Sequence, residues 1–221
     1  MSKNKWLRII MNNLTLYIGN KNYSSWSMRA WLVLKLANID FKEIKIELFS
    51  NEVLKISPSG KVPCLHDGKL KIWDTVAIIE YLNEKFPTQN LYPKEISLRN
   101  IARSCIAEMH SSFMSLRSEC PMNIKKNVSK NISKNAEDDL NRIYEIWDFC
   151  IEASGSNEYL MGNFSAVDAF FAPIVSRIIS YGLKQYKHEK YIEKIFNHKY
   201  FQEWRNDAIK ETSVIKCLEV A

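Results

Sequence analysis

The order of the strand and helix signals constrains this chain more than any other feature of its sequence. Residues 14–18 (LTLYI) predict a short strand, and apolar residues then recur at helical spacing up to Asn38. Residues 43–49 alternate apolar and charged side chains, which predicts a half-buried strand. A strand, a helix and a strand so close together in the chain predict a parallel, right-handed crossover unit.

A short helix, a hairpin and a further helix are expected to complete this unit. The Asp-Gly pair at 67–68 is a hairpin turn signal between the strand-like residues 62–66 and 70–73. An amphipathic helical pattern then begins at Asp74 and ends before Pro87. The predicted order is therefore β-α-β, a short helix, and β-β-α.

Strand signals disappear after a linker-like segment over residues 87–95. Beyond this segment the apolar spacing predicts only helices, over residues 96–118, 136–153, 165–181 and 188–210. We therefore expect an α/β domain over residues 12–88 and an all-α domain over residues 95–221.

Composition excludes several classes of function. The chain has six glycines, whereas average usage of about 7% would give roughly fifteen. Their spacing fits neither a dinucleotide-binding loop nor a nucleoside triphosphate loop. The net charge of +6 comes mainly from scattered lysines, which is typical of solvated faces. We therefore expect no nucleic-acid partner.

The cysteines and the apolar runs indicate a cytoplasmic protein. The five cysteines are widely spaced, form no C-x-x-C pair and have no metal-ligand spacing with the four histidines. We therefore expect reduced thiols and no metal site. No apolar run approaches membrane-spanning length, so no membrane association is expected. Met11 is an alternative start, which would leave residues 1–10 as an extension.

Three serines precede the first predicted helix, in the sequence Tyr-Ser-Ser-Trp-Ser-Met-Arg over residues 23–29. Capping the helix needs only one hydroxyl. A second hydroxyl at a helix N-terminus can instead donate to a bound thiolate, because the helix N-terminus lowers the pKa of a nearby thiol. No histidine lies in this loop to serve as a base, which argues against a hydrolase triad.

Two further features suit an extended peptide ligand. Val62-Pro63 at a strand start is either an ordinary edge turn or a cis-proline that turns the Val62 backbone outward to pair with a ligand. Asp74-Thr75 at a helix start is either a plain cap or a site for the free amino-acid end of a ligand. Together with the serine loop, these features indicate a small peptide that carries a thiol.

The first predicted domain resembles the thioredoxin-like domain of glutathione S-transferases. The segment from Ser24 to Trp31 is similar to the serine-type active-site loop, closest to zeta-like and related bacterial members. Val62-Pro63 resembles the cis-proline element, and Asp74-Thr75 resembles the γ-glutamyl motif. In the second domain, residues 165–173 resemble the buried capping box of the family, in which Ser165 and Asp168 cap a helix reciprocally.

The resemblance implies a role for each matching residue. It places the catalytic serine at Ser24, with Ser25 as the alternative, and leaves Ser27 to cap the helix. Glutathione, as co-substrate, is expected to contact the following residues: Trp26, Lys61, Val62, Pro63, Asp74 and Thr75. A substrate pocket is expected on the first long helix of the second domain, from His110, Met114 and Arg117, with Phe113 near the same face. Those helical positions are also compatible with ordinary core packing.

The resemblance predicts a homodimeric glutathione transferase that delivers the activated thiol to a small electrophile. Isomerisation, as in maleylacetoacetate isomerases, and peroxide reduction remain alternatives. Zeta isomerases carry a cysteine two residues after the serine, whereas this chain has Trp26 there, which weakens the isomerase hypothesis. A non-catalytic interaction protein built on the same fold is the alternative from another class. The identity of the electrophile stays open.

Overall fold

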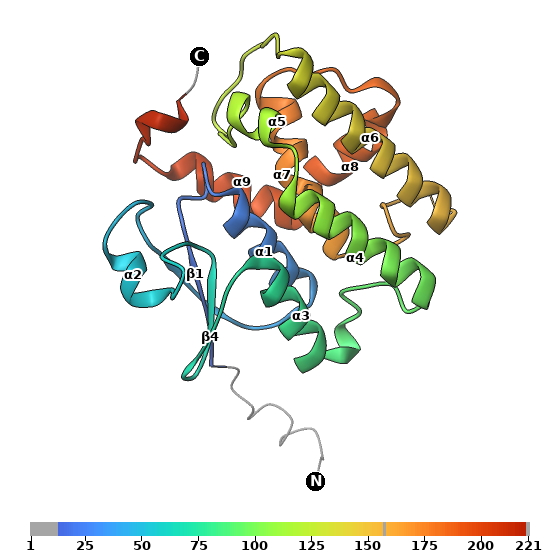
Figure 1. Ribbon diagram of the computed structural model, residues 1–221. Helices are drawn as coiled ribbons and strands as arrows, with labels where there is room; N and C mark the ends of the chain where they lie inside the picture. The colour runs from blue at the N-terminus through green and yellow to red at the C-terminus, as the bar shows by residue number, and fades with distance from the viewer. Residues whose placement is uncertain (1–12, 157, 220–221) are drawn as a thin grey trace.

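The first half of the chain is built on a mixed sheet with the strand order β2-β1-β3-β4. In the computed structural model, the described residues are 13–156 and 158–219, and the alternative start at Met11 lies outside them. Figure 1 shows the sheet beside a larger group of helices. The elements of this first half, here called the sheet unit, are β1 (Leu14–Ile18), α1 (Ser25–Leu36), β2 (Lys42–Lys45), α2 (Glu52–Ile56), β3 (Cys64–Asp67), β4 (Leu70–Ile72) and α3 (Thr75–Lys85).

The strand pairing confirms the predicted topology. β1 pairs in parallel with β2, so that Thr15 faces Lys42, and it pairs antiparallel with β3, so that Tyr17 faces Cys64. β3 and β4 form a hairpin whose turn glycine, Gly68, has φ of +59°. A positive φ is adopted readily by glycine, which explains the Asp-Gly signal. The β-α-β and β-β-α order is that of a thioredoxin-like fold.

The strand predicted over residues 43–49 is shorter than expected. β2 ends at Lys45 because its one neighbour, β1, ends at Ile18, the residue that faces Lys45. The alternation still holds in burial, since Ile46 is buried while Lys45 and Glu47 are exposed. The apolar pattern therefore predicted correctly which side chains are buried, although the strand ends before the pattern does.

The rest of the chain is helical, as predicted, although two expected helices are each broken into two. The helices of this second half, here called the helical unit, are α4 (Ile96–Ser111), α5 (Met114–Glu119), α6 (Lys134–Ser154), α7 (Ala166–Ser180), α8 (Glu189–Phe196) and α9 (Lys199–Lys210). The expected helix over 96–118 breaks because Phe113 adopts φ of +66°. The helix over 188–210 breaks at His198, whose side chain caps α9 by accepting from the Tyr200 N–H.

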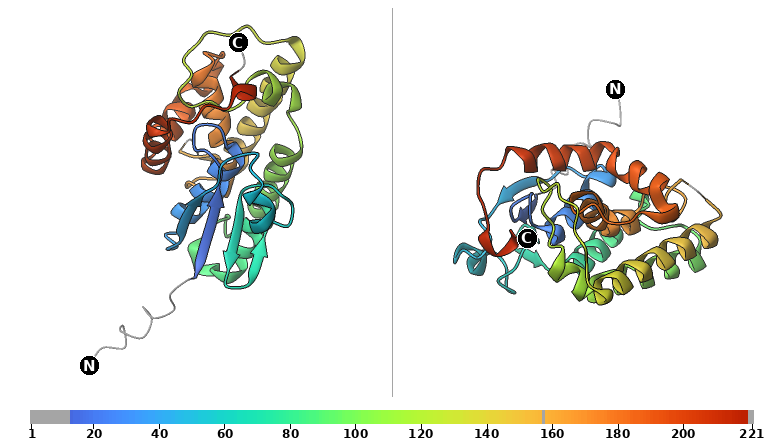
Figure 2. Two further views of the ribbon diagram at one scale, coloured as in Figure 1. Left: turned by 90° about the vertical axis from the view of Figure 1, so that its left-hand side faces the viewer. Right: turned by 90° about the horizontal axis from the view of Figure 1, so that it is seen from above.

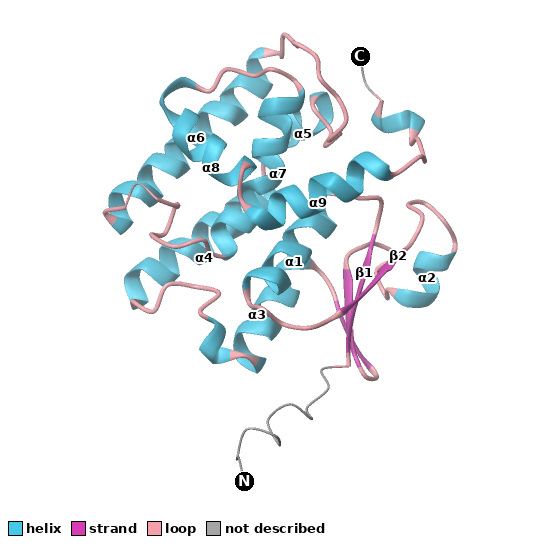
Figure 3. Ribbon diagram, turned by 180° about the vertical axis from the view of Figure 1, so that it is seen from behind, coloured by secondary structure: helices cyan, strands magenta, loops and turns pink. Residues whose placement is uncertain are grey.

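The two units share one apolar core. α1 and α3 cover the face of the sheet that is turned toward the helical unit, and α2 lies on the other side (Figure 3). α7 is the central helix and packs against α1, α4 and α8. Its aromatic residues Phe170 and Phe171 are completely buried. The N-terminal ends of α1 and α3 consequently lie where the two units meet.

The N-terminus of α7 has the predicted capping box. The Ser165 N–H donates to the Asp168 carboxylate over 2.8 Å, and the Ser165 side chain accepts from the N–H of Asp168. Asp168 also accepts from the Leu160 N–H and from the Tyr191 hydroxyl, each over 3.1 Å. Burial raises the pKa of Asp168 to about 6. This carboxylate therefore ties α7 to α8 and serves folding.

Candidate functional site

Ser24 is the residue that caps α1. Its hydroxyl accepts from the Ser27 N–H over 3.3 Å and donates to the Ser27 hydroxyl over 2.7 Å. Ser27 in turn accepts from the Gly19 N–H over 3.0 Å. The expectation that Ser27 caps the helix is therefore wrong, because Ser27 lies one turn inside and holds the end of β1 against α1.

Both candidate catalytic serines lie at the same helix N-terminus. Ser25 is the first residue of α1, and Ser24 and Ser25 are each only 6% exposed. The α1 N-terminus carries partial positive charge that favours an anion. No acidic residue stands in the first turn of α1 to neutralise this charge. Both hydroxyls therefore lie at a helix N-terminus that favours an anion.

The peptide bond between Val62 and Pro63 is cis, as the cis-proline interpretation expected. It lies immediately before β3, whose pairing with β1 begins at Cys64. Val62 itself therefore stands outside the registered part of the sheet. Lys61, one residue earlier, is exposed.

Asp74 caps α3 and also reaches across to the helical unit. One carboxylate oxygen accepts from the Val76 N–H over 3.0 Å, and the other lies 3.0 Å from Nε2 of His110. Thr75, which follows, is completely buried, and its hydroxyl has no hydrogen-bond partner among the described residues. The α3 N-terminus therefore presents a carboxylate and an unsatisfied hydroxyl next to each other.

The expected pocket residues separate because α4 ends at Ser111. His110, on the last turn of α4, contacts Asp74 and lies edge-on to the Trp26 ring, with the ring centres 5.0 Å apart. The Arg117 guanidinium lies 5.1 Å from the centre of the same ring. Met114, at the start of α5, is 68% exposed, whereas Phe113 is buried. The structure thus brings His110 and Arg117 to Trp26 and leaves Met114 in solvent.

His110 is neutral near pH 7. Burial lowers its pKa, and the charges of Arg29 and Arg117 lower it further, while Asp74 acts in the opposite direction. A neutral imidazole has one donor nitrogen, and Nε2 donates to Asp74. Nδ1 is then an acceptor, and it is buried without a partner within residues 13–156 and 158–219.

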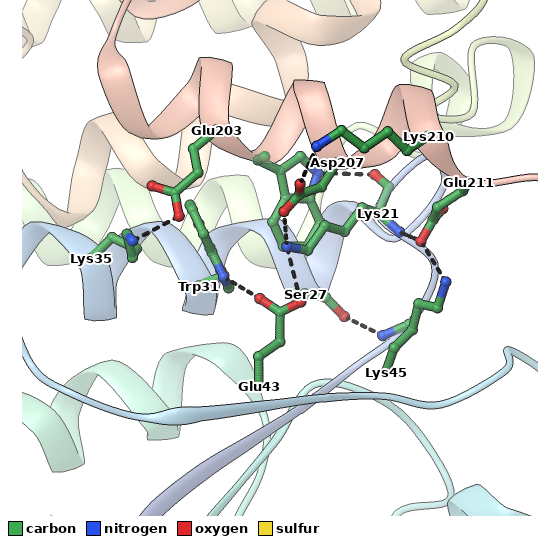
Figure 4. Close-up of polar contacts among 12 residues, drawn as sticks. Lys21, Ser27, Trp31, Lys35, Glu43, Lys45, Glu203, Asp207, Lys210 and Glu211 are labelled. Carbon is green, nitrogen blue, oxygen red and sulfur yellow. Dashed lines mark hydrogen bonds and ion pairs between the residues drawn. The ribbon is translucent and has the colours of Figure 1, made fainter.

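Sequence reasoning missed the part played by Lys21. Its ammonium is 6% exposed and lies 2.9 Å from Glu43 of β2 and 2.8 Å from Asp207 of α9 (Figure 4). The Trp204 indole N–H donates to the Lys21 carbonyl over 2.9 Å. The loop after β1 is therefore held by partners that lie far away in sequence, so no local pattern could identify them.

The C-terminal segment after α9 returns over the same loop (Figure 2). The Glu211 carboxylate accepts from the N–H groups of Lys21 and Asn22, over 2.9 and 3.1 Å. The Tyr23 hydroxyl donates to Glu219 over 2.6 Å. The residues just before Ser24 are thus held by α9 and the segment that follows it.

The cysteines are not arranged for catalysis. The buried cysteines are Cys64, Cys105, Cys120 and Cys150, and Cys217 is exposed. Burial raises the pKa of Cys64, and it raises that of Cys120 to about 11, which keeps both thiols protonated. The described residues contain no cluster of three metal-ligating side chains and no helix long and apolar enough to cross a membrane.

Comparisons with known proteins agree with this geometry. The family model for the glutathione S-transferase N-terminal domain matches residues 23–85. A zeta-class glutathione S-transferase from Euphorbia esula is 34% identical over 105 residues, which are 45% of this chain and 47% of that protein. The chain is therefore matched over about half the length of that relative.

Two further similarities cover more of the chain. A stringent starvation protein A homolog from Haemophilus ducreyi is 21% identical over 171 residues, 77% of each protein. A glutathione transferase homolog from Burkholderia BGR1, crystallised with bound glutathione, superposes with a TM-score of 0.70 at 23% identity, over 91% of this chain and all of that one. With the thioredoxin-like sheet unit and the cis Val62–Pro63 bond, we conclude that residues 23–85 form a domain of the glutathione S-transferase N-terminal family and that the fold of the chain is similar to that of a solved glutathione transferase.

Proposed function

We propose that this protein is a glutathione transferase, which binds reduced glutathione in the sheet unit and delivers its thiolate to a small electrophile. The observation that carries this proposal is the Ser24 hydroxyl at the N-terminus of α1. A hydroxyl donor and a helix N-terminus both favour the ionised form of a nearby thiol. The match of residues 23–85 to the glutathione S-transferase N-terminal domain supports it.

In this proposal, the thiol proton leaves to solvent when glutathione binds. The Ser24 hydroxyl then rotates from Ser27 to donate to the sulfur, while the Ser24 side chain keeps accepting from the Ser27 N–H. The thiolate attacks the electrophilic carbon, so that a carbon–sulfur bond forms while the bond from that carbon to its leaving group breaks and the leaving group departs with the electron pair. Catalysis is mainly positioning and electrostatic stabilisation of the sulfur.

The rest of glutathione is assigned to the cis-proline edge and to the α3 N-terminus. The Val62 backbone would pair with the cysteinyl unit beside Pro63, and Thr75 would donate to the γ-glutamyl carboxylate. Asp74 would accept from the γ-glutamyl ammonium group. The exposed Lys61 would reach the glycyl carboxylate, and Trp26 would close the site from α1.

Residues 12–88 and 95–221 are proposed to be two domains, with the electrophile between them near His110, Arg117 and Met114. We propose a cytoplasmic homodimer. Exposed apolar residues on β4 and α4 supply surface for the second copy, since Leu70 is 51% and Ile96 is 65% exposed. A screen of substrates would identify the electrophile. It would also distinguish transfer from isomerisation and peroxide reduction.

Calorimetric titration with reduced glutathione tests the proposal. Thr75→Val should weaken glutathione binding about tenfold, because it removes the hydroxyl that is proposed to donate to the γ-glutamyl carboxylate. The same variant should fold as stably as the wild type, because the Thr75 hydroxyl has no partner to lose among the described residues. Thr88→Val, at an exposed position, is the matched control.

A non-catalytic interaction protein is the second candidate, favoured by the similarity to the stringent starvation protein A homolog. Such a protein need not bind glutathione. A wild-type protein that gives no heat of binding with glutathione would therefore refute the transferase proposal and favour this one.

A further inference from the structure

Arg29 is a completely buried arginine without a hydrogen-bond partner. It is 0% exposed, and Nε, Nη1 and Nη2 all lack an acceptor within the described part of the chain. A guanidinium has five N–H donors. Burying such a charge unpaired is costly, so buried charges are normally paired. Arg29 therefore has the capacity to bind an anion that residues 13–156 and 158–219 do not supply.

Aromatic rings surround this guanidinium. Its central carbon lies 4.4 Å from the centre of the Trp26 ring and 5.1 Å from that of Phe170. Contact with ring faces stabilises a cation only in part. The rings leave the N–H donors unsatisfied, and those donors match the two oxygens of a carboxylate.

The charges around Arg29 are mostly positive. Arg117 lies against the Trp26 ring and donates to the Ser112 carbonyl over 2.8 Å, and Arg177 donates to the Cys120 carbonyl over 2.8 Å. Burial and then these two charges hold the pKa of Arg29 well below its usual value, and only Asp74 acts in the other direction. An entering anion would thus meet an excess of positive charge.

The location suits a second substrate. Arg29 lies one turn along α1 from Ser25, which is about 6 Å at 1.5 Å per residue. Trp26 is half-buried, whereas Arg29 is fully buried, and the indole ring lies against the guanidinium.

We propose that Arg29 binds the carboxylate of an acidic electrophile and that Trp26 is the movable cover of this site. The substrate class is therefore a small carboxylic acid whose reactive carbon lies close to the carboxylate. The thiolate sulfur bonds to that carbon, the leaving group departs with the electron pair, and the carboxylate is unchanged. The electrophile part of this inference rests on the proposed transferase function, whereas the carboxylate site does not.

The first experiment needs no glutathione. Wild-type protein is titrated with propionate and, as the uncharged match, with propionamide, while the tryptophan fluorescence is recorded. Propionate should change the emission and propionamide should not. The change should disappear in Trp26→Phe, which removes the reporter, and in Arg29→Met, which removes the charge. Arg99→Met, elsewhere on the protein, should respond as the wild type does.

The second experiment compares iodoacetate with iodoacetamide as electrophiles for glutathione, in proteins that carry Cys217→Ser to remove the exposed thiol. Arg29→Met should lower kcat/KM for iodoacetate about ten- to a hundredfold, the value of one charge-assisted contact. Its kcat/KM for iodoacetamide and its affinity for glutathione should be unchanged. Arg29→Lys should restore part of the iodoacetate activity.

Stability distinguishes this site from a structural arginine. Because Arg29 is unpaired, Arg29→Met should raise the denaturation midpoint, whereas loss of a structural arginine would lower it. The proposal would be overturned if Arg29→Met had a lower denaturation midpoint and kept the wild-type ratio of iodoacetate to iodoacetamide activity. It would also be overturned if propionate did not change the fluorescence of the wild type. Loss of glutathione affinity in Arg29→Met would assign the residue to glutathione instead. A wild type that responds to propionate but does not bind glutathione would refute only the transferase function.

Discussion

Nε2 of His110 lies 3.0 Å from the carboxylate of Asp74, and this contact joins the end of α4 to the start of α3. Asp74 thereby belongs to both units, since its other oxygen caps α3. His110 also touches Trp26 at the start of α1. The proposed glutathione site and the proposed electrophile site consequently share these residues. A substitution in one site should therefore alter binding at the other.

The two candidate serines should differ in stability as well as in chemistry. Ser24→Ala removes the cap of α1 and should lower the free energy of unfolding by about 0.5–2 kcal/mol. Ser25→Ala, inside the helix, should change it by less than about 0.5 kcal/mol. Urea denaturation measures both. If Ser24 is catalytic, only Ser24→Ala should lose conjugation activity at saturating glutathione, and the reverse result would move the role to Ser25.

The capping box of α7 should be important for folding and unimportant for chemistry. Ser165→Ala should cost about 1 kcal/mol of unfolding free energy. Asp168→Ala should cost about 3 kcal/mol or more, because it leaves the N–H groups of Ser165 and Leu160 buried without an acceptor. Glutathione affinity of the folded fraction should not change. The exposed Ser118→Ala is the control, and equal losses for Ser118 and Ser165 would contradict the prediction.

The ion cluster at Lys21 should stabilise the contact between the two units. Lys21→Met should lower the free energy of unfolding by about 1–3 kcal/mol, a moderate loss because Glu43 and Asp207 are 33% and 43% exposed and can be hydrated. Lys210→Met is the matched control. Its ammonium contacts Asp207 but is 77% exposed, so its loss should cost less than about 0.5 kcal/mol. A double-mutant cycle with Asp207→Asn should show coupling for Lys21 only.

Acidification should destabilise the protein through His188. This histidine is 4% exposed, and burial lowers its pKa below 6.5, although its contact with Asp148 opposes the shift. The unfolded state then takes up a proton at a higher pH than the folded state does. Stability is therefore complete above pH 6.5 and falls as the pH drops from 6.5 toward the folded pKa.

The size of this effect is limited to about 1.4 kcal/mol for each pH unit between the two pKa values. Denaturation of wild type and His188→Gln at pH 7.5 and 5.5 measures it. Asp168 acts oppositely, since its raised pKa favours the folded state as the pH falls below about 6. The comparison between the two proteins cancels that contribution. An equal acid dependence in both proteins would contradict the assignment.

Features that depend on neighbouring residues could be predicted from the sequence. The bounds of β1, the hairpin at Gly68, the cap at Asp74 and the box of Ser165 with Asp168 all follow from short-range hydrogen bonding and side-chain alternation. Each needs only a few residues of context, and each is confirmed by the structure.

Features that depend on distant partners could not be predicted. The apolar spacing continues through Phe113, so no local sequence pattern predicts the left-handed backbone of Phe113 that separates α4 from α5. Lys21 finds Asp207 at a separation of 186 residues. Arg29 stands in the serine-loop motif, yet only the packing of α1 on α7 shows that its guanidinium is buried and unpartnered.

Ionisation of bound glutathione tests the central proposal most directly. The ultraviolet absorbance of the thiolate is recorded for glutathione in the presence of wild-type protein while the pH is raised from 5 to 9, with Ser24→Ala in parallel. We predict that the bound thiol ionises at least about one pH unit below its ordinary pKa near 8.5, and that Ser24→Ala loses most of this shift. A bound thiol that titrates as it does in free solution would contradict the proposed transferase function.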